Sequence, residues 1–545
     1  MSLIELIRRH IKTSPHTFVL LALLSGVSNV LVMTLITTSA GVEQAALDLR
    51  TITMFGLVIG IYIVSQRGLM RITATEVESM IHDLRMALVE NISHAELLSL
   101  ERVGRSEILT GMIRDTQTIS QASNILVIAV QSIIMIALSM VYVFLINKIA
   151  FVLSLSFIAF SMLLILRHMI ALRAELNTVY EEENHLYDGL RDVLEGFKEV
   201  KMSPPRRIDI LAEIDIAATR ARDVKIAFQG RAAQEFVLSQ TMSFLLLGII
   251  VFIAPMFFSV EAGAAARTAA AMLFIIGPLA MVTQAIPIFA TANAAADNLS
   301  QLEHLLQSLV STIPGMIERP LPATFEAIHF DTVSFTYVDN KAVDMFTVGP
   351  FNFSIRQGET LFITGGNGSG KSTLVKLLVG LYYPEKGVIR IDQQALSAET
   401  YSSYRSKFSV IFSDYYLFKR LYGLNAPSPE IIDELCLLLE ILGKVRLKDA
   451  NRFDTIDLST GQRKRLALLV TLLEDKPIIV LDEWAADQDP HFRRKFYQEL
   501  LPHLKALGKT IIAITHDDRY FDTADRCIAL EEGRITSDIS KKPLQ

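Results

Sequence analysis

The first 300 residues of the chain contain six stretches in which no side chain is charged. A helix that crosses a membrane needs about 20 mostly apolar residues, and six such stretches in succession are not expected of buried helices in a soluble protein. We therefore predict six membrane-spanning helices. They fall at Thr17–Gly41, Thr51–Gln66, most of Thr116–Asn147, Ile149–Leu166, Phe236–Val260 and Thr268–Ala290.

Two long polar segments between these stretches also have a helical pattern. Residues 67–115 lack proline and are predicted to form a continuous amphipathic helix, and residues 167–235 are similar apart from a break at Pro204-Pro205. About thirty helical residues reach roughly 45 Å, well beyond the lipid headgroups. We expect their tips, near Leu98–Gly104 and Lys201–Ile210, to contact another cytoplasmic part of the protein, although a hairpin that packs only on itself is the alternative.

The distribution of Lys and Arg gives an orientation. The N-terminus carries three, segment 67–115 six and segment 167–235 eleven, whereas the alternate loops carry one each, namely Arg50, Lys148 and Arg267. Because cytoplasmic loops are enriched in Lys and Arg, both termini are expected in the cytoplasm of a multi-pass protein. The first apolar stretch is too long for the core of a signal peptide, so we expect it to be retained.

The pattern changes after prolines 314, 320 and 322, where short β-rich runs such as "AIHFDTVSFTY" begin to alternate with helical stretches. The predicted fold class is therefore an all-α six-helix membrane domain, residues 1–313, followed by a linker, residues 314–323, and a cytosolic α/β domain, residues 324–545.

The strand "TLFIT" leads into "GGNGSGKST", residues 365–373, here called the phosphate loop. It fits the pattern G-x-x-x-x-G-K-[ST] at Gly365, Gly370, Lys371 and Ser372, and the helix "TLVKLLVGLY" follows it. Glycines let backbone N–H groups close around phosphates, and the N-terminus of the helix favours negative charge. We predict that Lys371 reaches the β- and γ-phosphates of a nucleotide and that the Ser372 hydroxyl binds Mg²⁺.

About 110 residues later the stretch "VLDEWAADQDP" has four carboxylates directly after an apolar strand. We predict that Asp482 is a ligand of the same Mg²⁺, directly or through water, and that Glu483 acts as general base on the attacking water. A solvated acidic loop, the alternative, does not account for the strand or for the phosphate loop.

Composition narrows the class of protein. The chain is 51% hydrophobic and 20% charged. Its net charge of −6 argues against a nucleic-acid partner. The two cysteines, Cys436 and Cys527, lie in apolar runs and are expected to be core residues.

The segment "LSTGQRKRLALLV", residues 458–470, completes a set of motifs that resembles the ATP-binding-cassette family. The resemblance implies that Ser459, Gly461 and Gln462 bind the γ-phosphate of ATP held by the other subunit, with Thr460 in place of a usual glycine. It implies that His516 contacts the γ-phosphate, that Tyr337 stacks on adenine and that Asp489 lies at a dimer interface. The implied ATP-binding residues are Tyr337, Gly365, Asn367, Gly368, Ser369, Gly370, Lys371, Ser372, Thr373, Ser459, Gly461 and Gln462, the catalytic residues are Glu483 and His516, and the Mg²⁺ ligands are Ser372, Asp482 and Ser413.

Ser413 departs from the family pattern, which has glutamine at this position of "VIFSDYYLF". A serine is too short both to reach the Mg²⁺ or the attacking water and to contact the membrane helices. Either water fills the gap or Asp414 shares the role.

Within the family the domain order resembles that of exporters. The runs "FSDYYLF" and "LDEWAADQDPHFR" resemble bacterial exporters of cyclic peptides and peptide siderophores, with Trp484 and Asp487 as the distinguishing residues. A bulky core residue is the alternative explanation of Trp484. The chain begins shortly before its first helix, without an N-terminal protease domain, which argues against the exporters that cleave leader peptides.

These features lead to one functional hypothesis. We expect a homodimer in the bacterial inner membrane that exports a compact, cyclic peptide or a peptide siderophore by alternating access, driven by ATP with Mg²⁺; a lipid flippase or multidrug exporter of the same fold is the alternative. Polar residues within the spans could contact cargo, but we favour interhelical hydrogen bonds for most of them. They are Asn29, Gln131, Gln240 and Gln284.

Overall fold

The computed structural model describes residues 3–10, 15–39, 49–103, 108–109, 111–253, 262–308, 319–338, 345–449 and 451–541. The chain divides into two compact units. The first comprises Met1–Ser93 and Arg105–Gln307, and the second comprises His94–Gly104 and Ser308–Gln545. Part of the predicted linker, including Pro314, lies outside the described residues.

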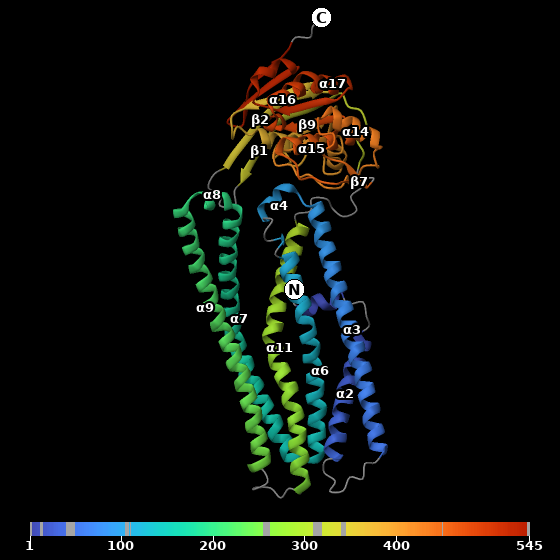
Figure 1. Ribbon diagram of the computed structural model, residues 1–545, viewed down its shortest axis with the longest axis vertical. Coiled ribbons are helices and arrows are strands. Elements are labelled where there is room, and N and C mark those ends of the chain that lie inside the picture. Colours follow the sequence, from blue (N-terminus) through green and yellow to red (C-terminus); the bar gives the residue numbers. More distant parts are fainter. Residues whose placement is uncertain are drawn as a thin grey trace. The chain divides into compact units, whose positions relative to one another are not determined.

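The first unit is helical, and its long helices run alongside one another (Figure 1). Helix α7 packs along α9, and α6 packs against α2 and α7. The helices are α1 (Leu3–His10), α2 (Pro15–Ser39), α3 (Leu49–His94), η1 (Gly111–Asp115), α6 (Thr116–Ile146), α7 (Lys148–Glu195), α8 (Phe197–Met202), α9 (Pro204–Gly248), η2 (Ile249–Ile253) and α11 (Ala262–Ser308).

Local capping explains where several of these helices begin. The Asn147 side chain accepts hydrogen bonds from the N–H groups of Ile149 and Ala150, which starts α7 one residue after α6 ends. The Ser203 side chain caps α9, whose first position is proline, where the missing N–H costs nothing. The predicted break at Pro204-Pro205 is therefore the start of α9.

Five of the described helices are long and apolar enough to cross a membrane. They match five of the six predicted spans, and the sixth, Ile149–Leu166, lies at the start of α7 as a shorter apolar stretch, Lys148–Leu163. The second span continues, as predicted, to His94 in α3.

The prediction of a continuous helix over residues 67–115 was wrong. Helix α3 ends at His94, and a separate short helix, α4 (Leu97–Val103), follows within the second unit. Leu97 and Leu98 pack against the hydrophobic core of that unit. Burial of these two leucines compensates for the break in the helix. The predicted contact near Leu98–Gly104 is thus made by α4.

The second unit contains three sheets. A four-stranded antiparallel sheet has the order β2-β1-β4-β5, a six-stranded sheet has the order β12-β11-β3-β10-β9-β6, and β7 pairs with β8. The strands are β1 (Ala327–Val338), β2 (Met345–Arg356), β3 (Thr360–Gly365), β4 (Lys386–Ile391), β5 (Gln394–Ala395), β6 (Phe408–Ile411), β7 (Leu447–Asp449), β8 (Arg452–Phe453), β9 (Ile478–Asp482), β10 (Thr510–Ile514), β11 (Arg526–Glu531) and β12 (Arg534–Ser540).

Five strands of the six-stranded sheet, β11, β3, β10, β9 and β6, are parallel. Their carboxyl ends therefore meet at one edge, where ligands bind in open α/β sheets. Besides α4, the described helices of this unit are α12 (Lys371–Leu378), α13 (Tyr401–Arg405), α14 (Pro429–Leu438), α15 (Thr460–Glu474), η3 (Trp484–Asp487), α16 (Pro490–Lys495), η4 (Phe496–Leu500), α17 (Leu501–Ala506) and η5 (Asp518–Thr523).

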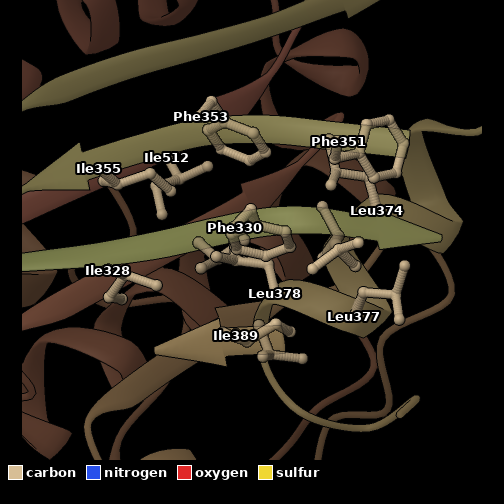
Figure 2. Close-up of a cluster of buried hydrophobic side chains, with 14 of the residues drawn as sticks. Ile328, Phe330, Phe351, Phe353, Ile355, Leu374, Leu377, Leu378, Ile389 and Ile512 are labelled. Atoms are coloured by element: carbon tan, nitrogen blue, oxygen red, sulfur yellow. The ribbon is translucent and has the colours of Figure 1, made fainter. Parts of the chain in front are cut away.

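A hydrophobic cluster joins the antiparallel sheet to the helix that follows the phosphate loop (Figure 2). Phe330 of β1 and Phe353 of β2 stack with their ring centroids 4.6 Å apart. Leu374 and Leu378 of α12 are fully buried in the same cluster. This packing fixes α12, and with it the start of the helix at Lys371.

Of the four polar residues singled out in the spans, two make interhelical hydrogen bonds. Gln131 of α6 bonds to Gln66 of α3, and Asn29 of α2 donates to the Met135 sulfur of α6. Gln240 and Gln284 make none that the described part of the chain shows. Cys436 is buried and Cys527 packs against the same core, as predicted.

Candidate functional site

The phosphate loop joins the end of β3 to the start of α12. Gly365, Gly368 and Gly370 have φ values of 145°, 76° and 94°, which other residues rarely adopt. A Cβ at Gly365 would overlap the carbonyl oxygen of Leu530 in the adjacent strand β11. The loop can therefore close tightly over this strand end, with backbone N–H groups available to an anion.

The ammonium of Lys371 lies over this loop. Its Nζ donates to the carbonyl oxygens of Gly365, at 2.9 Å, and Gly366, at 2.8 Å, and the side chain is buried. Ser372 is exposed and Thr373 half-buried in the first turn of α12. The loop thus combines a fixed positive charge, a helix N-terminus and a hydroxyl at its open side.

Three further predicted residues lie along the loop. Asn367 and Gly368 are exposed, whereas Ser369 is buried. Within the described residues the Ser369 hydroxyl has no hydrogen-bond partner. Buried polar atoms normally have a partner, so this hydroxyl is an exception within the phosphate loop.

Asp482 is the last residue of β9 and is buried. Burial raises the pKa of its carboxyl group, and hydrogen bonds from Ser413 and the nearby Lys371 ammonium oppose this shift. The Ser413 backbone N–H donates to Asp482 Oδ2 at 3.3 Å. Ser413 therefore reaches this carboxylate through its backbone, whereas Asp414 is exposed.

Glu483 and His516 face one another from adjacent strand ends. Nε2 of His516 lies 3.3 Å from Oε1 of Glu483, and both side chains are partly exposed. Glu483 has a φ of 51°, in the left-handed region, and its N–H donates to the carbonyl of Ile514 at the end of β10. The strained backbone turns the carboxylate away from the strand, which is common at functional sites.

The four carboxylates of the "VLDEWAADQDP" stretch divide into two pairs. Asp482 and Glu483 belong to the strand edge just described, whereas the other two form ion pairs with α15. Lys464 lies 2.8 Å from Asp487, and Arg465 lies 2.5 Å from Asp489. Lys464 also donates to the Glu483 carbonyl. These ion pairs hold α15 against the end of β9.

Trp484 is a core residue. It is almost fully buried against Phe492 and Phe496, and its indole N–H donates to the Lys464 carbonyl at 2.8 Å. These contacts support the alternative explanation of Trp484, namely that it is a packing residue of the core.

Ser459 begins α15 and forms a capping box with Gln462. The hydroxyl accepts from the Gln462 N–H at 3.4 Å, and the Gln462 side chain accepts from the Ser459 N–H at 3.3 Å. Gly461 lies close to the Asp487 backbone, where a Cβ would be 3.1 Å from its carbonyl oxygen. Tyr337, near the end of β1, is 41% exposed.

The structure therefore assembles the phosphate loop, Ser413, Asp482, Glu483 and His516 at one edge of the parallel sheet. The side-chain hydrogen bonds of Ser459 and Gln462, in contrast, are made with each other. No group of three His, Cys, Asp or Glu residues that could hold a metal occurs among the described positions. Mg²⁺ bound through phosphates needs only one or two protein ligands, so Asp482 with the Ser372 hydroxyl would be enough to hold it.

Sequence reasoning missed the residues that connect α4 to the rest of the second unit. Glu101 accepts from Lys376 Nζ at 2.9 Å and from the Tyr382 hydroxyl at 2.6 Å. Lys376 lies on α12, five residues after Lys371. The sequence indicated only that the region near Leu98–Gly104 would contact a cytoplasmic part of the protein.

Comparisons with known proteins agree with this architecture. Residues 348–486 match the family model described as "ABC transporter". The chain is 34% identical over 468 residues to "ATP-binding protein SyrD" of Pseudomonas syringae pv. syringae, which covers 84% of this chain and 82% of that protein. It is 29% identical over 367 residues to "ATP-dependent lipid A-core flippase" of Alkalilimnicola ehrlichii, covering 64% of this chain and 59% of that one.

Among solved structures, a bacterial Atm1-family ABC exporter with ATP bound superposes with a TM-score of 0.77. The superposition covers 96% of this chain and 95% of that chain, at 17% sequence identity. This similarity concerns the fold, and it confirms the predicted fold class of a helical membrane domain fused to an α/β nucleotide-binding domain.

Proposed function

This chain belongs to the ABC transporter family, and from that premise we propose that it exports a compact, constrained peptide, cyclic or siderophore-like, out of the cytoplasm. It is an ABC ATPase coupled to transport. The observation that carries the proposal is the assembly of phosphate loop, Asp482 and the Glu483–His516 pair in a chain whose described residues also include five membrane-length apolar helices.

The roles of the ATP-site residues are part of this proposal. The phosphate loop would hold the β- and γ-phosphates with Lys371, and Tyr337 would stack on adenine. Ser372 and Asp482 would hold Mg²⁺, with Ser413 fixing the Asp482 carboxylate through its backbone. Mg²⁺, when bound, supplies neutralisation of the phosphate charge.

Glu483 would act as the general base. Its carboxylate is partly exposed and can accept a proton from the attacking water. His516, 3.3 Å away, would orient this carboxylate and contact the γ-phosphate. The Lys464 bond to the Glu483 carbonyl supports the backbone that holds the carboxylate in place.

We also propose a homodimer with shared ATP sites. Ser459 stands at the N-terminus of α15, a helix of 15 residues, where the helix dipole favours an anion. In the proposed dimer this end would face the γ-phosphate bound by Lys371 of the other subunit. Closing the dimer on ATP and reopening it after hydrolysis would alternate the access of the membrane part.

For the cargo, the support comes from residues in the spans and from the motif around Trp484. The six apolar stretches carry no charged side chain, which suits a compact peptide without strong charge. The motif resemblance to exporters of cyclic peptides and peptide siderophores points the same way. The name of the Pseudomonas syringae relative, ATP-binding protein SyrD, states only ATP binding.

A lipid flippase is the second candidate. It is favoured by relatives named lipid A-core flippase, such as that of Paraburkholderia xenovorans, which is 24% identical over 85% of this chain. A multidrug exporter of the same fold is a related alternative. In each case we place the protein in the bacterial inner membrane with both termini in the cytoplasm, as the Lys and Arg distribution indicates.

The experiment that separates these candidates is ATPase stimulation in purified, reconstituted protein by cyclic peptides, siderophores, phospholipids and drugs. We expect a cyclic peptide to stimulate hydrolysis more than its linear counterpart, because a constrained cargo loses less conformational entropy on binding. Strong stimulation by phospholipids without any by peptides would favour the flippase.

A further inference from the structure

A cavity of about 540 Å³ lies within the first unit, between helices α2, α3, α6 and α11. We propose that it binds neutral amide groups of the cargo. This inference rests on the proposed function, because it names the cargo chemistry that such an exporter would recognise. The volume is within the range of small-molecule sites, so the cavity can hold one face of a cyclic peptide.

The cavity wall contains a reciprocal pair of carboxamides. Gln131 Nε2 donates to Gln66 Oε1 at 2.5 Å, and Gln66 Nε2 donates to Gln131 Oε1 at 3.2 Å. Ser25 adds a third member, donating to Gln66 Oε1 at 2.8 Å and accepting from Gln131 Nε2 at 3.0 Å. Three helices thus each contribute one neutral polar group to the same network.

This network leaves hydrogen-bonding capacity for a ligand. A carboxamide has two N–H donors and two acceptor lone pairs. Gln66 uses one of its N–H donors in these bonds, and Gln131 uses one of its lone pairs. One N–H donor of Gln66 and one acceptor lone pair of Gln131 are therefore left. Together they complement the C=O and N–H of a single peptide group.

Two further groups at the cavity can bond to an amide. The Asn29 side chain donates to the Met135 sulfur, which is a weak acceptor. Replacing this sulfur by an amide oxygen of the ligand as the acceptor is therefore favourable. Pro278 lies inside α11 and lacks the N–H that would otherwise bond to the Phe274 carbonyl. Phe274 and Pro278 are both among the residues that line the cavity.

Charge and depth support the same ligand class. None of the described residues that line the cavity is charged. Burying an ion there without a partner would be costly, whereas amides would find partners. Gln66 lies 17 residues from the start of α3, or roughly 26 Å at 1.5 Å per residue, which on the predicted topology is the inner half of the membrane.

The competing explanation is that the network only holds the helices together. Gly277 of α11 separates the two explanations, because it lines the cavity but takes no part in the network. A Cβ at Gly277 would have no heavy atom within 4 Å. A large side chain can therefore be added there without removing any bond between helices.

The test uses the full-length protein in nanodiscs and a tritiated cyclic hexapeptide of glycine, leucine and serine, with binding measured without ATP. Gly277→Phe should weaken binding at least tenfold. Gly60→Phe is the matched control, since Gly60 also has open space around a Cβ but does not line the cavity. Binding to the Gly60 variant should equal that of the wild type, and size-exclusion chromatography verifies the folding of both.

A second measurement needs no variant. The same peptide with all amide nitrogens methylated should bind the wild-type protein at least tenfold more weakly, because its donors are lost. Equal binding of the peptide by wild type and Gly277→Phe, together with peptide-stimulated ATP hydrolysis, would overturn this site and leave the proposed function standing. If the wild type neither binds the peptide nor hydrolyses ATP faster in its presence, both fail.

Discussion

Nε2 of His516 lies 3.3 Å from Oε1 of Glu483, across the ends of two adjacent parallel strands. This relationship follows from the register of the sheet, in which Ile514 of β10 is opposite Asp482 of β9. Glu483, the next residue after Asp482, donates its backbone N–H to the carbonyl of Ile514. This bond directs the Glu483 carboxylate towards the residues that follow β10. The pair is thereby fixed before any ligand binds.

We expect Glu483→Gln to bind ATP normally and to hydrolyse it about 10²- to 10⁴-fold more slowly, the usual contribution of a general base. The amide keeps the shape and a hydrogen bond to His516 but cannot accept the proton. Single-turnover ATP hydrolysis and equilibrium ATP binding measure the two effects. Glu499→Gln, an exposed carboxylate on η4, is the control, and turnover of Glu483→Gln near the wild-type rate would assign the base to another residue.

Asp482→Asn should separate stability from activity. Burial raises the pKa of Asp482 in the folded protein above its value in the unfolded chain. At a pH above the folded pKa, ionisation of this group therefore destabilises the fold, and the destabilisation is lost as the pH falls through that pKa. At pH 7 without nucleotide, Asp482→Asn should therefore raise the Tm, because the neutral amide does not carry this cost.

The same variant should lose Mg²⁺-dependent hydrolysis, because a neutral amide is a poor ligand for this cation. Differential scanning fluorimetry in EDTA measures the Tm, and a Mg²⁺ titration measures the activity. A lowered Tm would show that the ionised carboxylate stabilises the fold, contrary to the direction of its pKa.

Shared ATP sites can be tested with mixed dimers. A Lys371→Ala chain combined with a Ser459→Asp chain should regain about half of the wild-type ATP binding, since one composite site per dimer keeps both native residues. Aspartate caps a helix as well as serine does, so α15 should stay folded while the added charge repels phosphate. Purification through two different affinity tags isolates the mixed dimers, and absence of rescue in them would contradict sharing.

The contact of Glu101 with Lys376 and Tyr382 should transmit cargo binding to the phosphate-loop helix. We expect Glu101→Gln to reduce peptide-stimulated ATP hydrolysis about fivefold, the effect of roughly 1 kcal/mol from one partly exposed ion pair. Basal hydrolysis should stay unchanged. Glu96→Gln, a nearby carboxylate outside these two bonds, is the control; equal stimulation in both variants would remove Glu101 from the coupling path.

Local patterns predicted much of this structure. The lengths of the apolar stretches located the helices, because the thickness of the bilayer sets the length of a span. The phosphate loop was predicted from Gly365, Gly370, Lys371 and Ser372, a pattern that lies within eight consecutive residues. Asp482 and Glu483 could be predicted because a buried strand followed by acids indicates the carboxyl edge of a parallel sheet.

Contacts between distant segments could not be predicted in this way. The end of α3 at His94 has no proline or glycine beside it, and only the packing of Leu97 and Leu98 on the second unit explains it. Gln66 was placed at the end of a span, and its pairing with Gln131 depends on the packing of α3 against α6. The core position of Trp484 likewise depends on Lys464, twenty residues away.

The central claim is that ATP hydrolysis at the Glu483 site drives export of a compact neutral peptide, and inside-out membrane vesicles test it most directly. ATP and the tritiated cyclic hexapeptide are added outside, where the nucleotide-binding unit faces on the predicted topology. We predict that wild-type vesicles accumulate the peptide only with ATP and Mg²⁺ and that Glu483→Gln vesicles do not. Peptide accumulation that is equal in wild-type and Glu483→Gln vesicles, or absent from both, would contradict the claim.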